Sequence, residues 1–505
     1  MCYNENMKIK SRRGSTFKRV LIWLISFLAV FTIVFFGIQF FTKTGVFRIP
    51  GVVYYDESLS DTELNELQKI FTEEVDLDKD VYISAKNYLS RPELDSNEFL
   101  INIYVPVTDF YNTEDNIIAP DDPDLLFADA YVSDVAFDMI EIDKLDFNKR
   151  LLSINDKYFL DSFNEGAVFR VLTFESEKYD EEIEPLIGET FIKEFPEDSS
   201  VLTFAQTGVT ALSRGMNAKL YKVGDATYFS EGIRDFLSSF DITHTSNESS
   251  FTDYANTGNI CSDKRFVDTL VDIGLDIVEL TGNHNLDCGI PAALETIDVY
   301  NEKGIRIVGG GTNADTAAIP LEIDEKGTDI TFLAYNLSTG GATKGDYPGA
   351  NQYYEENAAA EIKAAKEKGD FVIVDIQYYE CNAYASEYED PICDYPQNTP
   401  GDEIGFFRHL IDLGADLVVG TSAHQPQTFE LYGDGAIYYG LGNLFFDQYW
   451  WPGTTRSLIL SHYFYKGKLL QTKIVPTVYD GDLQTKLLDK ENSKWILARL
   501  ISARP

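Results

Sequence analysis

The 505-residue chain is poor in basic residues. It has 42 Lys and Arg against 82 Asp and Glu, which gives a formal net charge of −40. A surface this acidic repels nucleic acid, so partners of that class are excluded. An anionic polymer would need a metal ion or a locally different surface to bind. Global disorder is also excluded, because hydrophobic residues make up 44% of the chain and aromatic residues 13%.

Cysteine is scarce, and none of the five cysteines has the CxxC spacing of a redox or zinc motif. Cys2 precedes a long apolar segment, and Cys261, Cys288, Cys381 and Cys393 follow it. Four cysteines allow three full pairings, and the spacing does not choose among them. Four free, buried thiols are equally compatible with the sequence.

Residues 20–41 read VLIWLISFLAVFTIVFFGIQFF without a charge. About 20 apolar residues are enough to cross a bilayer as a helix. Lys and Arg are concentrated in residues 1–19, so the positive-inside rule places this tail in the cytoplasm and the rest outside the cell. No small-residue cleavage site follows, which favours an uncleaved anchor over a signal peptide. We therefore expect a single-pass protein of the cell membrane with most of its mass extracellular.

Two folded regions are expected after this segment. Residues 51–199 combine acidic stretches with short apolar runs and a helix that Ser60 or Asp61 would cap, which predicts a smaller extracellular α+β domain of unknown role. Residues 201–479 alternate strand-like and helical segments, which is typical of a layered α/β domain. Three of the helical segments end at a glycine, namely Gly274, Gly304 and Gly414. Residues 480–505 form a C-terminal extension.

Polar residues gather where the strands of the 201–479 region end. In α/β sheets, ligands bind beyond the carboxyl ends of the strands. Carboxylate, amide and imidazole groups are ligands that hard divalent cations accept. Such a site would use a metal-bound water as nucleophile and a nearby histidine as acid or orienting group. The strand-end residues are Asn247, Glu248, Asn283, His284, Asp287, Gln377, Ser422, His424, Asn443 and Asp447.

The region from about Val201 to Tyr479 resembles the CapA family of poly-γ-glutamate capsule synthesis proteins. The matching segments include VLTFAQTGVTALSRGM, TGNHNLDCG, LVVGTSAHQPQTFELY and AIYYGLGNLFFDQ. The resemblance implies an α/β fold of the metallophosphatase-like class, a layered αββα sandwich. It also implies a role in making, exporting or anchoring an anionic cell-surface polymer, together with other membrane proteins of polymer synthesis and export.

Several usual metal ligands of related metallophosphatases are replaced in this chain. Residues 207–210 read TGVT where a Gly-Asp pair is usual, Gln377 stands where a histidine is usual, and Ser422 replaces the first histidine of a His-x-His pair. Only five histidines occur in the whole chain. A two-metal centre would be short of ligands, so we expect at most one weakly bound divalent metal, namely Mn, Mg, Fe or Zn.

The expected site residues fall into three groups. His284 and Glu248 are the candidate catalytic residues, and Asp287 is expected to orient His284. Glu248, Asn283 and His424 are the candidate metal ligands. His244, His409 and His462 are expected to be packing or surface residues. The candidate binding residues are Asn247, Asn283, Arg214, Gln377, Asp287 and Asn443.

Three functions remain open at this point. The first is polymer synthesis, export or anchoring, with the strand-end pocket holding a polymer segment. The second is a metal-dependent hydrolase or transferase acting on amide or phosphoester bonds, with His284 as acid or base. The third is a non-catalytic polymer-binding module with a degenerate metal site.

Overall fold

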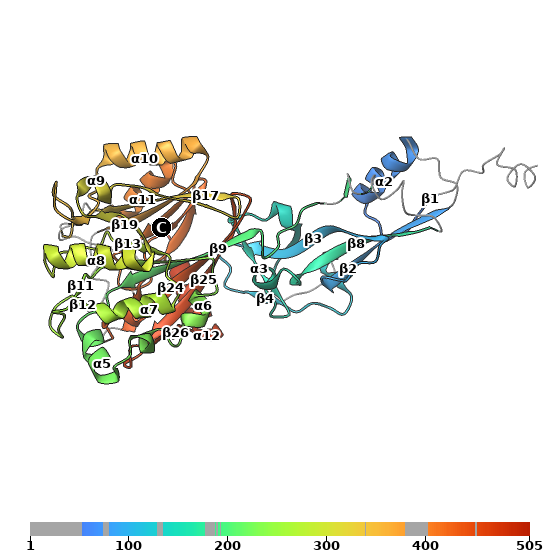
Figure 1. Cartoon of the computed structure of the whole chain (residues 1–505). Helices are drawn as coiled ribbons and strands as arrows, with labels where there is room; N and C mark the ends of the chain where they lie inside the picture. Colours follow the sequence, from blue (N-terminus) through green and yellow to red (C-terminus); the bar gives the residue numbers. More distant parts are fainter. Residues whose placement is uncertain are drawn as a thin grey trace, which may run out of the picture. The chain divides into compact units, whose positions relative to one another are not determined.

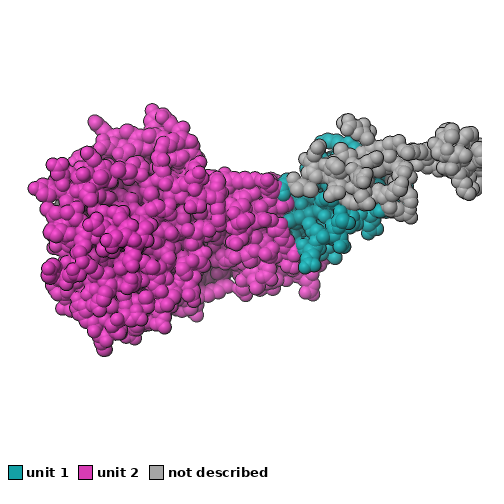
Figure 2. Space-filling model, in the orientation of Figure 1, with its two compact units in different colours: residues 1–88, 92–102, 169–193 teal, residues 89–91, 103–168, 194–505 magenta. Residues whose placement is uncertain are grey.

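The computed structural model describes residues 53–73, 80–128, 135–176, 187, 190–191, 193–338, 340–378, 402–449 and 452–505. The expected membrane span at residues 20–41, Cys381 and Cys393 lie outside these residues. Among the helices that the structure describes, none is long and apolar enough to cross a membrane. The chain forms two compact units: residues 1–88, 92–102 and 169–193 make the smaller, and residues 89–91, 103–168 and 194–505 the larger (Figure 2).

The smaller unit contains β1 (Val53–Tyr55), α2 (Asp61–Glu73) and parts of β2 (Val81–Ser90), β3 (Glu98–Asp109) and β8 (Glu165–Glu175). Helix α2 begins with a reciprocal cap. The Ser60 backbone N–H donates to the Glu63 carboxylate at 2.7 Å, and the Glu63 N–H donates to the Ser60 hydroxyl at 3.3 Å. Glu63 also forms a buried ion pair with Arg170 of β8. Of the two predicted capping residues, Ser60 and Asp61, Ser60 is therefore the one that caps the helix.

The larger unit takes in more of the chain than the region from residue 201 onward. Residues 103–168 belong to it and contain β4 (Asn116–Ile117), β5 (Asp138–Glu141), β6 (Lys149–Leu151), β7 (Ser153–Ile154) and α3 (Phe159–Ser162). The Leu151 backbone N–H donates to the side chain of Gln471 at 2.7 Å, and Phe110 contributes to the main hydrophobic core. The sequence predicts one domain over residues 51–199, whereas the contacts group residues 103–168 with 194–505.

Two sheets form the centre of the larger unit (Figure 1). The first has the strand order β14-β13-β10-β9-β24-β25-β26, with β23 also paired to β9. Its strands are β9 (Val201–Thr210), β10 (Ile242–Asn247), β13 (Ile277–Glu279), β14 (Arg306–Val308), β23 (Asn443–Phe445), β24 (Arg456–Tyr465), β25 (Lys468–Tyr479) and β26 (Thr485–Leu487).

The second sheet has the order β16-β17-β19-β20-β22-β21. Strands β17, β19, β20 and β22 are parallel to one another, as are β9, β10, β13 and β14 of the first sheet. The strands of the second sheet are β16 (Leu321–Glu325), β17 (Thr328–Asn336), β19 (Phe371–Gln377), β20 (Leu417–Gly420), β21 (Phe429–Tyr432) and β22 (Gly435–Tyr438). Short pairs are β11 (Phe251–Thr252) with β12 (Ser262–Asp263) and β15 (Gly310–Gly311) with β18 (Gly349–Ala350).

Helices cover the outer faces of the two sheets. Helices α5, α6, α7 and α8 pack on the first sheet, and α10 and α11 pack on the second (Figure 1). Between the sheets, residues such as Phe204 and Ile277 face Phe332 and Val419 in one core. The layers therefore run helix, sheet, sheet, helix, and the predicted mixed α/β architecture is confirmed. The helices are α5 (Gly215–Val223), α6 (Arg234–Leu237), α7 (Val267–Asp272), α8 (Ile290–Lys303), α9 (Ala314–Ala317), α10 (Glu355–Lys368), α11 (Glu403–Asp412) and α12 (Lys490–Ser502).

Glycines terminate three of these helices as predicted. Gly274, Gly304 and Gly414 all have positive φ angles, which favour glycine over residues with a Cβ atom. The C-terminal extension contributes to the core as well. Its helix α12 is capped by Asp489 and places Ile496 and Leu500 in the core between the sheets.

Candidate functional site

The ends of parallel strands from both sheets position the candidate residues. Glu248 directly follows β10, and Asn283 lies in the loop between β13 and α8. Gln377 is the last residue of β19, and His424 lies four residues after the end of β20. Because the carboxyl ends of parallel strands share one edge of a sheet, these segments can meet there although they are far apart in sequence.

Four of these side chains do meet. The Gln377 side-chain amide donates to Asn283 Oδ1 at 3.2 Å and to Glu248 Oε1 at 3.5 Å. Glu248 Oε2 lies 3.8 Å from His424 Nε2, which is beyond hydrogen-bond distance. Glu248 and Gln377 are fully buried, and His424 is 3% exposed. We call Glu248, Asn283, Gln377 and His424 the strand-end cluster.

Asn443 determines how the imidazole of His424 is oriented. Asn443 Nδ2 donates to the His424 carbonyl, the Thr454 carbonyl and the Gln448 side chain, so Asn443 Oδ1 is the acceptor that faces His424 Nδ1 at 2.8 Å. The Nδ1 atom therefore carries the proton, and Nε2 is the atom turned toward Glu248. A partner that fixes the tautomer in this way is typical of metal-binding and acid–base histidines.

Gly282 allows the loop after β13 to approach the cluster. A Cβ atom at position 282 would lie 2.6 Å from Glu248 Cα, closer than real Cβ contacts permit. The absence of a side chain therefore brings the backbone of the TGNHNLDCG segment against Glu248. The close contact with Glu248 explains why position 282 is a glycine.

His284 lies at the accessible end of this loop. Its Nδ1 is 2.8 Å from Asp287 Oδ2, and the two side chains are 24% and 42% exposed. Asp287 thus holds the imidazole of His284, which is the orienting role predicted for it. Cys288, the residue after Asp287, forms a disulfide with Cys261 and so fixes the same loop. This is one of the pairings that the cysteine spacing left open.

Two further candidates have other partners. The Arg214 guanidinium donates to Asp447 at 3.1 Å and stacks 4.5 Å from the ring of Phe446, which in turn packs against His424. Arg214 is therefore connected to the cluster through the ring of Phe446. Asn247 donates to the Tyr300 hydroxyl at 2.8 Å and to the Ser249 carbonyl at 3.0 Å, which ties the end of β10 to helix α8.

A second polar group, which was not among the predicted site residues, joins the two sheets. His244 Nε2 lies 3.1 Å from Asp375 Oδ2, and Gln206 donates to Asp375 Oδ1 at 2.6 Å. Burial, together with the charge of Asp375, raises the pKa of Glu279 to about 7. All four residues are fully buried. The available signal was Asp375, a carboxylate that stands between Val374 and Ile376 in the apolar run of β19.

His462 is buried beside this group and is a packing residue, as predicted. Its Nδ1 hydrogen-bonds Thr472 Oγ1 at 2.8 Å, and its ring stacks on Phe204. Burial and the nearby His244 lower the pKa of His462 to about 3, so its ring is neutral near neutral pH. His409, on α11, forms an ion pair with Glu355 at 2.6 Å and is exposed, also as predicted.

The strand-end cluster fits one cation better than two. Within the described ranges, no three His, Cys, Asp or Glu side chains are grouped so that they could hold a metal ion. Glu248 and His424 are the two strong donors, and their facing atoms are 3.8 Å apart. The buried Gln377 Oε1 accepts no hydrogen bond from another described residue and is a further oxygen donor. One carboxylate, one imidazole and neutral amides match a single, weakly held divalent cation.

Comparison with known proteins points to one family. Residues 203–448 match the family model described as "Bacterial capsule synthesis protein PGA_cap". The chain is 26% identical over 232 residues to the capsule biosynthesis protein CapA of Bacillus anthracis, covering 44% of this chain and 53% of that protein. It is 27% identical over 205 residues to the PGA biosynthesis protein CapA of Bacillus subtilis, covering 40% and 50%.

A further match is a probable polyglutamine synthesis accessory protein of Mycobacterium tuberculosis, which is 29% identical over 181 residues and covers 33% of this chain and 44% of that protein. The chain therefore spans about half the length of the relatives it matches. The matched stretch contains every member of the strand-end cluster.

Proposed function

Residues 203–448 belong to the CapA family of bacterial capsule synthesis proteins, and from this premise we propose that the protein takes part in the synthesis, export or anchoring of an anionic cell-surface polymer such as poly-γ-glutamate. The observation that carries the proposal is the meeting of Glu248, Asn283, Gln377 and His424 at the strand ends. These side chains form the polar floor that holds a segment of the polymer.

The amide groups of the cluster suit an amide-linked polymer. Gln377 and Asn283 each carry an N–H donor and a carbonyl acceptor, which match the carbonyl and N–H of a γ-glutamyl linkage. Glu248 is the one carboxylate of the cluster. The cluster therefore repels the carboxylates of the polymer only weakly, although the chain as a whole has a net charge of −40.

One divalent cation held by Glu248 and His424 is part of the proposal. When bound, the cation would offset the charge of Glu248 and attract a carboxylate of the polymer. Asn443 would keep His424 Nε2 directed toward Glu248, and Gln377 would hold Asn283 in place.

The cellular location is also part of the proposal. Residues 20–41 anchor the protein in the cell membrane, with residues 1–19 in the cytoplasm and the larger part of the chain outside. This arrangement places the strand-end cluster on the side where a capsule polymer accumulates. Its partners are other membrane proteins of polymer synthesis or export.

A second candidate function is hydrolysis or transfer at an amide or phosphoester bond. The His284–Asp287 pair favours it, because a partly exposed imidazole oriented by a carboxylate is the usual form of a general acid or base. His284 is adjacent in sequence to Asn283 of the cluster. A non-catalytic polymer-binding module is the contrasting possibility, and it requires only the cluster.

Calorimetry with a γ-glutamyl oligomer tests the binding proposal on the purified full-length protein, with and without added Mn²⁺. We expect Glu248→Gln and His424→Ala each to weaken binding by about tenfold or more, since each removes a charged or oriented polar contact. His409→Ala is the matched control, because His409 is exposed on α11. Equal binding by the wild type, His424→Ala and His409→Ala would refute the assignment.

Metal content and turnover then separate the two candidate functions. Elemental analysis of the purified protein is paired with assays on γ-glutamyl peptides and phosphodiesters. Turnover that is lost in His284→Ala, while oligomer binding persists, would establish the enzyme. Binding without turnover under every metal condition would establish the module.

A further inference from the structure

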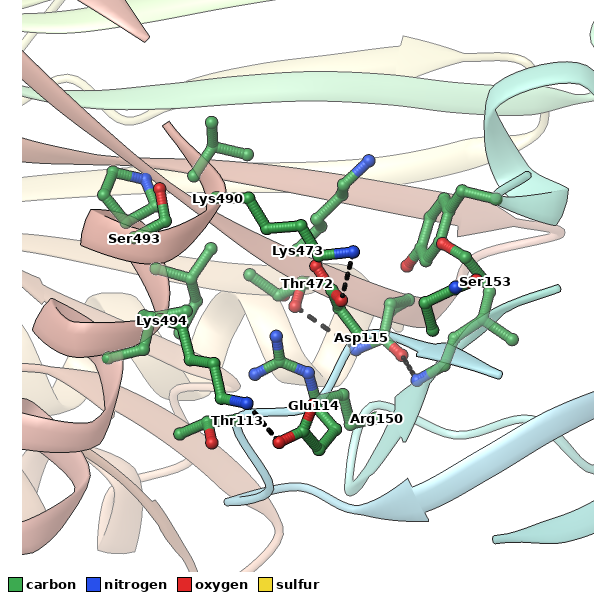
Figure 3. Close-up of a pocket in the computed structure, with 18 of the residues that line it drawn as sticks. Thr113, Glu114, Asp115, Arg150, Ser153, Thr472, Lys473, Lys490, Ser493 and Lys494 are labelled. Atoms are coloured by element: carbon green, nitrogen blue, oxygen red, sulfur yellow. Dashed lines mark hydrogen bonds and ion pairs between the residues drawn. The ribbon is translucent and has the colours of Figure 1, made fainter. Parts of the chain in front are cut away.

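The larger unit contains a cavity of about 420 Å³ that shares no residue with the strand-end cluster. Its walls come from the 113–116 segment, from β6 and β7, from β25 and from helix α12 (Figure 3). The volume lies within the range of small-molecule sites in proteins. Charged residues dominate the lining: Glu114, Asp115, Arg150, Asp156, Asp161, Lys473, Lys490 and Lys494.

The lining carboxylates are all engaged by lysines. Lys490 lies 3.2 Å from Asp115 and 3.4 Å from Asp156. Lys494 pairs with Glu114, as the dashed line in Figure 3 marks. In the same way, the lining lysine Lys473 lies 3.1 Å from Asp161, which also accepts from the Tyr463 hydroxyl at 2.9 Å. The lysines and carboxylates of the cavity are therefore already partnered with one another.

Arg150 is different. Its guanidinium forms no hydrogen bond or ion pair with another residue in the part of the chain that the structure describes, and it lies among the labelled side chains of Figure 3. Burial lowers the pKa of Arg150, while the charges of Asp115 and Glu114 act in the opposite direction. A guanidinium stays protonated at neutral pH and carries several N–H donors in a planar fork. The guanidinium therefore lines the cavity without an acceptor among the described residues.

The position of Arg150 is imposed by the backbone. Strand β6 pairs antiparallel with β3, with Arg150 opposite Thr108, and the next residue, Leu151, is bonded to Gln471 of β25. Arg150 is therefore held at its Cα by two neighbouring strands, and its side chain lines the cavity. A pre-positioned guanidinium loses less conformational freedom on binding than a side chain on a loop.

We propose that this cavity binds one carboxylate group of a small organic ligand, with Arg150 as the recognition residue. The guanidinium fork matches the two oxygens of a carboxylate in a bidentate contact. A carboxylate adds one negative charge to a lining of four basic and four acidic residues. A phosphate adds up to two charges beside the same four carboxylates, so the cavity selects the monoanion.

Helix α12 contributes to the same wall. Lys490 is its first residue, and Ser493 and Lys494 belong to its first turns. The positive end of the helix dipole therefore adds to the attraction that Arg150 exerts on an anion. The proposal goes beyond the function proposed above, because the cavity and the strand-end cluster have no residue in common and can be tested independently.

The test uses purified full-length protein and ligand-observed NMR. The probes are N-acetyl-L-glutamine, which has one carboxylate, its neutral amide, a γ-glutamyl tripeptide and inorganic phosphate. We expect saturable binding of N-acetyl-L-glutamine, at least about tenfold weaker binding of the amide, and a similar loss in Arg150→Gln. Arg150→Lys should recover part of the affinity, since it keeps the charge and loses the fork.

Two more variants complete the design. Lys486→Gln removes an exposed cation paired with Asp480 and should bind as the wild type does. Ser493→Phe fills the cavity from the surface of α12 and should block binding without altering Arg150, which covers the case that Arg150→Gln does not fold. The tripeptide and N-acetyl-L-glutamine distinguish a polymer segment from a free amino-acid derivative as the source of the carboxylate.

Three results would overturn the proposal. The first is no saturable binding of either carboxylate by the folded wild-type protein. The second is wild-type affinity in a folded Arg150→Gln or Ser493→Phe variant. The third is tighter binding of phosphate than of N-acetyl-L-glutamine. The comparison of Arg150→Gln with Lys486→Gln reports on this cavity, because the cavity lining contains no residue of the strand-end cluster.

Discussion

Replacing Glu279 by glutamine should remove a pH dependence that this residue gives to the stability of the larger unit. Glu279 ends β13, is fully buried and lies near Asp375 between the two sheets. Burial first, and the charge of Asp375 second, raise its pKa from 4.5 to about 7. The folded protein therefore keeps this proton at pH values where the unfolded chain has released it. Glutamine is close in size and never ionises.

The sign and size of the effect follow from the two pKa values. Because the folded value is the higher one, the stability that the proton provides is fully present below pH 4.5 and is lost as the pH rises through about 7. Each unit of difference is worth about 1.36 kcal/mol, which gives a limit of about 3 kcal/mol. Between pH 5 and pH 8, this residue should lower the free energy of unfolding by about 2.5 kcal/mol.

Urea unfolding at pH 5, 6, 7 and 8, followed by circular dichroism, measures this difference. The free energy of unfolding of the wild type should fall across this range by about 2.5 kcal/mol more than that of Glu279→Gln. Glu302→Gln, which neutralises an exposed glutamate of α8, is the matched control and should keep the wild-type slope. If Glu279→Gln and Glu302→Gln had the same slope as the wild type, the proposed protonation of Glu279 would be refuted.

Three further predictions concern other parts of the fold. Cys261→Ser opens a disulfide that spans 27 residues and should cost about 3.5 kcal/mol in urea unfolding, so unchanged stability would contradict the loop-entropy argument. Arg170→Met leaves Glu63 buried without its main partner, and the loss of about 3–5 kcal/mol should be partly recovered by adding Glu63→Gln, as a double-mutant cycle would measure. Gly282→Ala places a Cβ against the backbone of Glu248 and should weaken γ-glutamyl oligomer binding in calorimetry. Unchanged binding would show that the close approach of Gly282 to Glu248 is not needed for the binding site.

The layered domain was predictable because the sequence pattern of each strand and helix lies within a short stretch of the chain. Apolar strands alternate with helices that end at Gly274, Gly304 and Gly414, and each of these glycines has the positive φ that the pattern requires. The assignment of residues 103–168 to the larger unit is not local. It depends on contacts such as Leu151 with Gln471, which are 320 residues apart in sequence. No composition change marks that grouping.

The strand-end cluster was predictable for a similar reason. Parallel strands bring their carboxyl ends to one edge, so Glu248, Gln377 and His424 could be grouped from their positions alone. The side-chain direction of Asn247 was not predictable, because neighbouring strand residues point to opposite faces and Asn247 turns toward Tyr300. His244 was assigned to packing because its partner, Asp375, comes from the other sheet.

The substitutions at the strand ends and the charge of the chain have a common consequence. Where the resemblance to metallophosphatase-like proteins implies ionic or imidazole ligands, this chain has a threonine-containing segment at 207–210, Gln377 and Ser422. Each replacement reduces the capacity to hold a second metal and keeps a neutral hydrogen-bonding group in place. A buried floor with one carboxylate, that of Glu248, repels an anionic polymer less than a cluster of carboxylates would. We therefore expect elemental analysis to give at most one metal per chain, and a stoichiometry of two metals per chain would contradict this expectation.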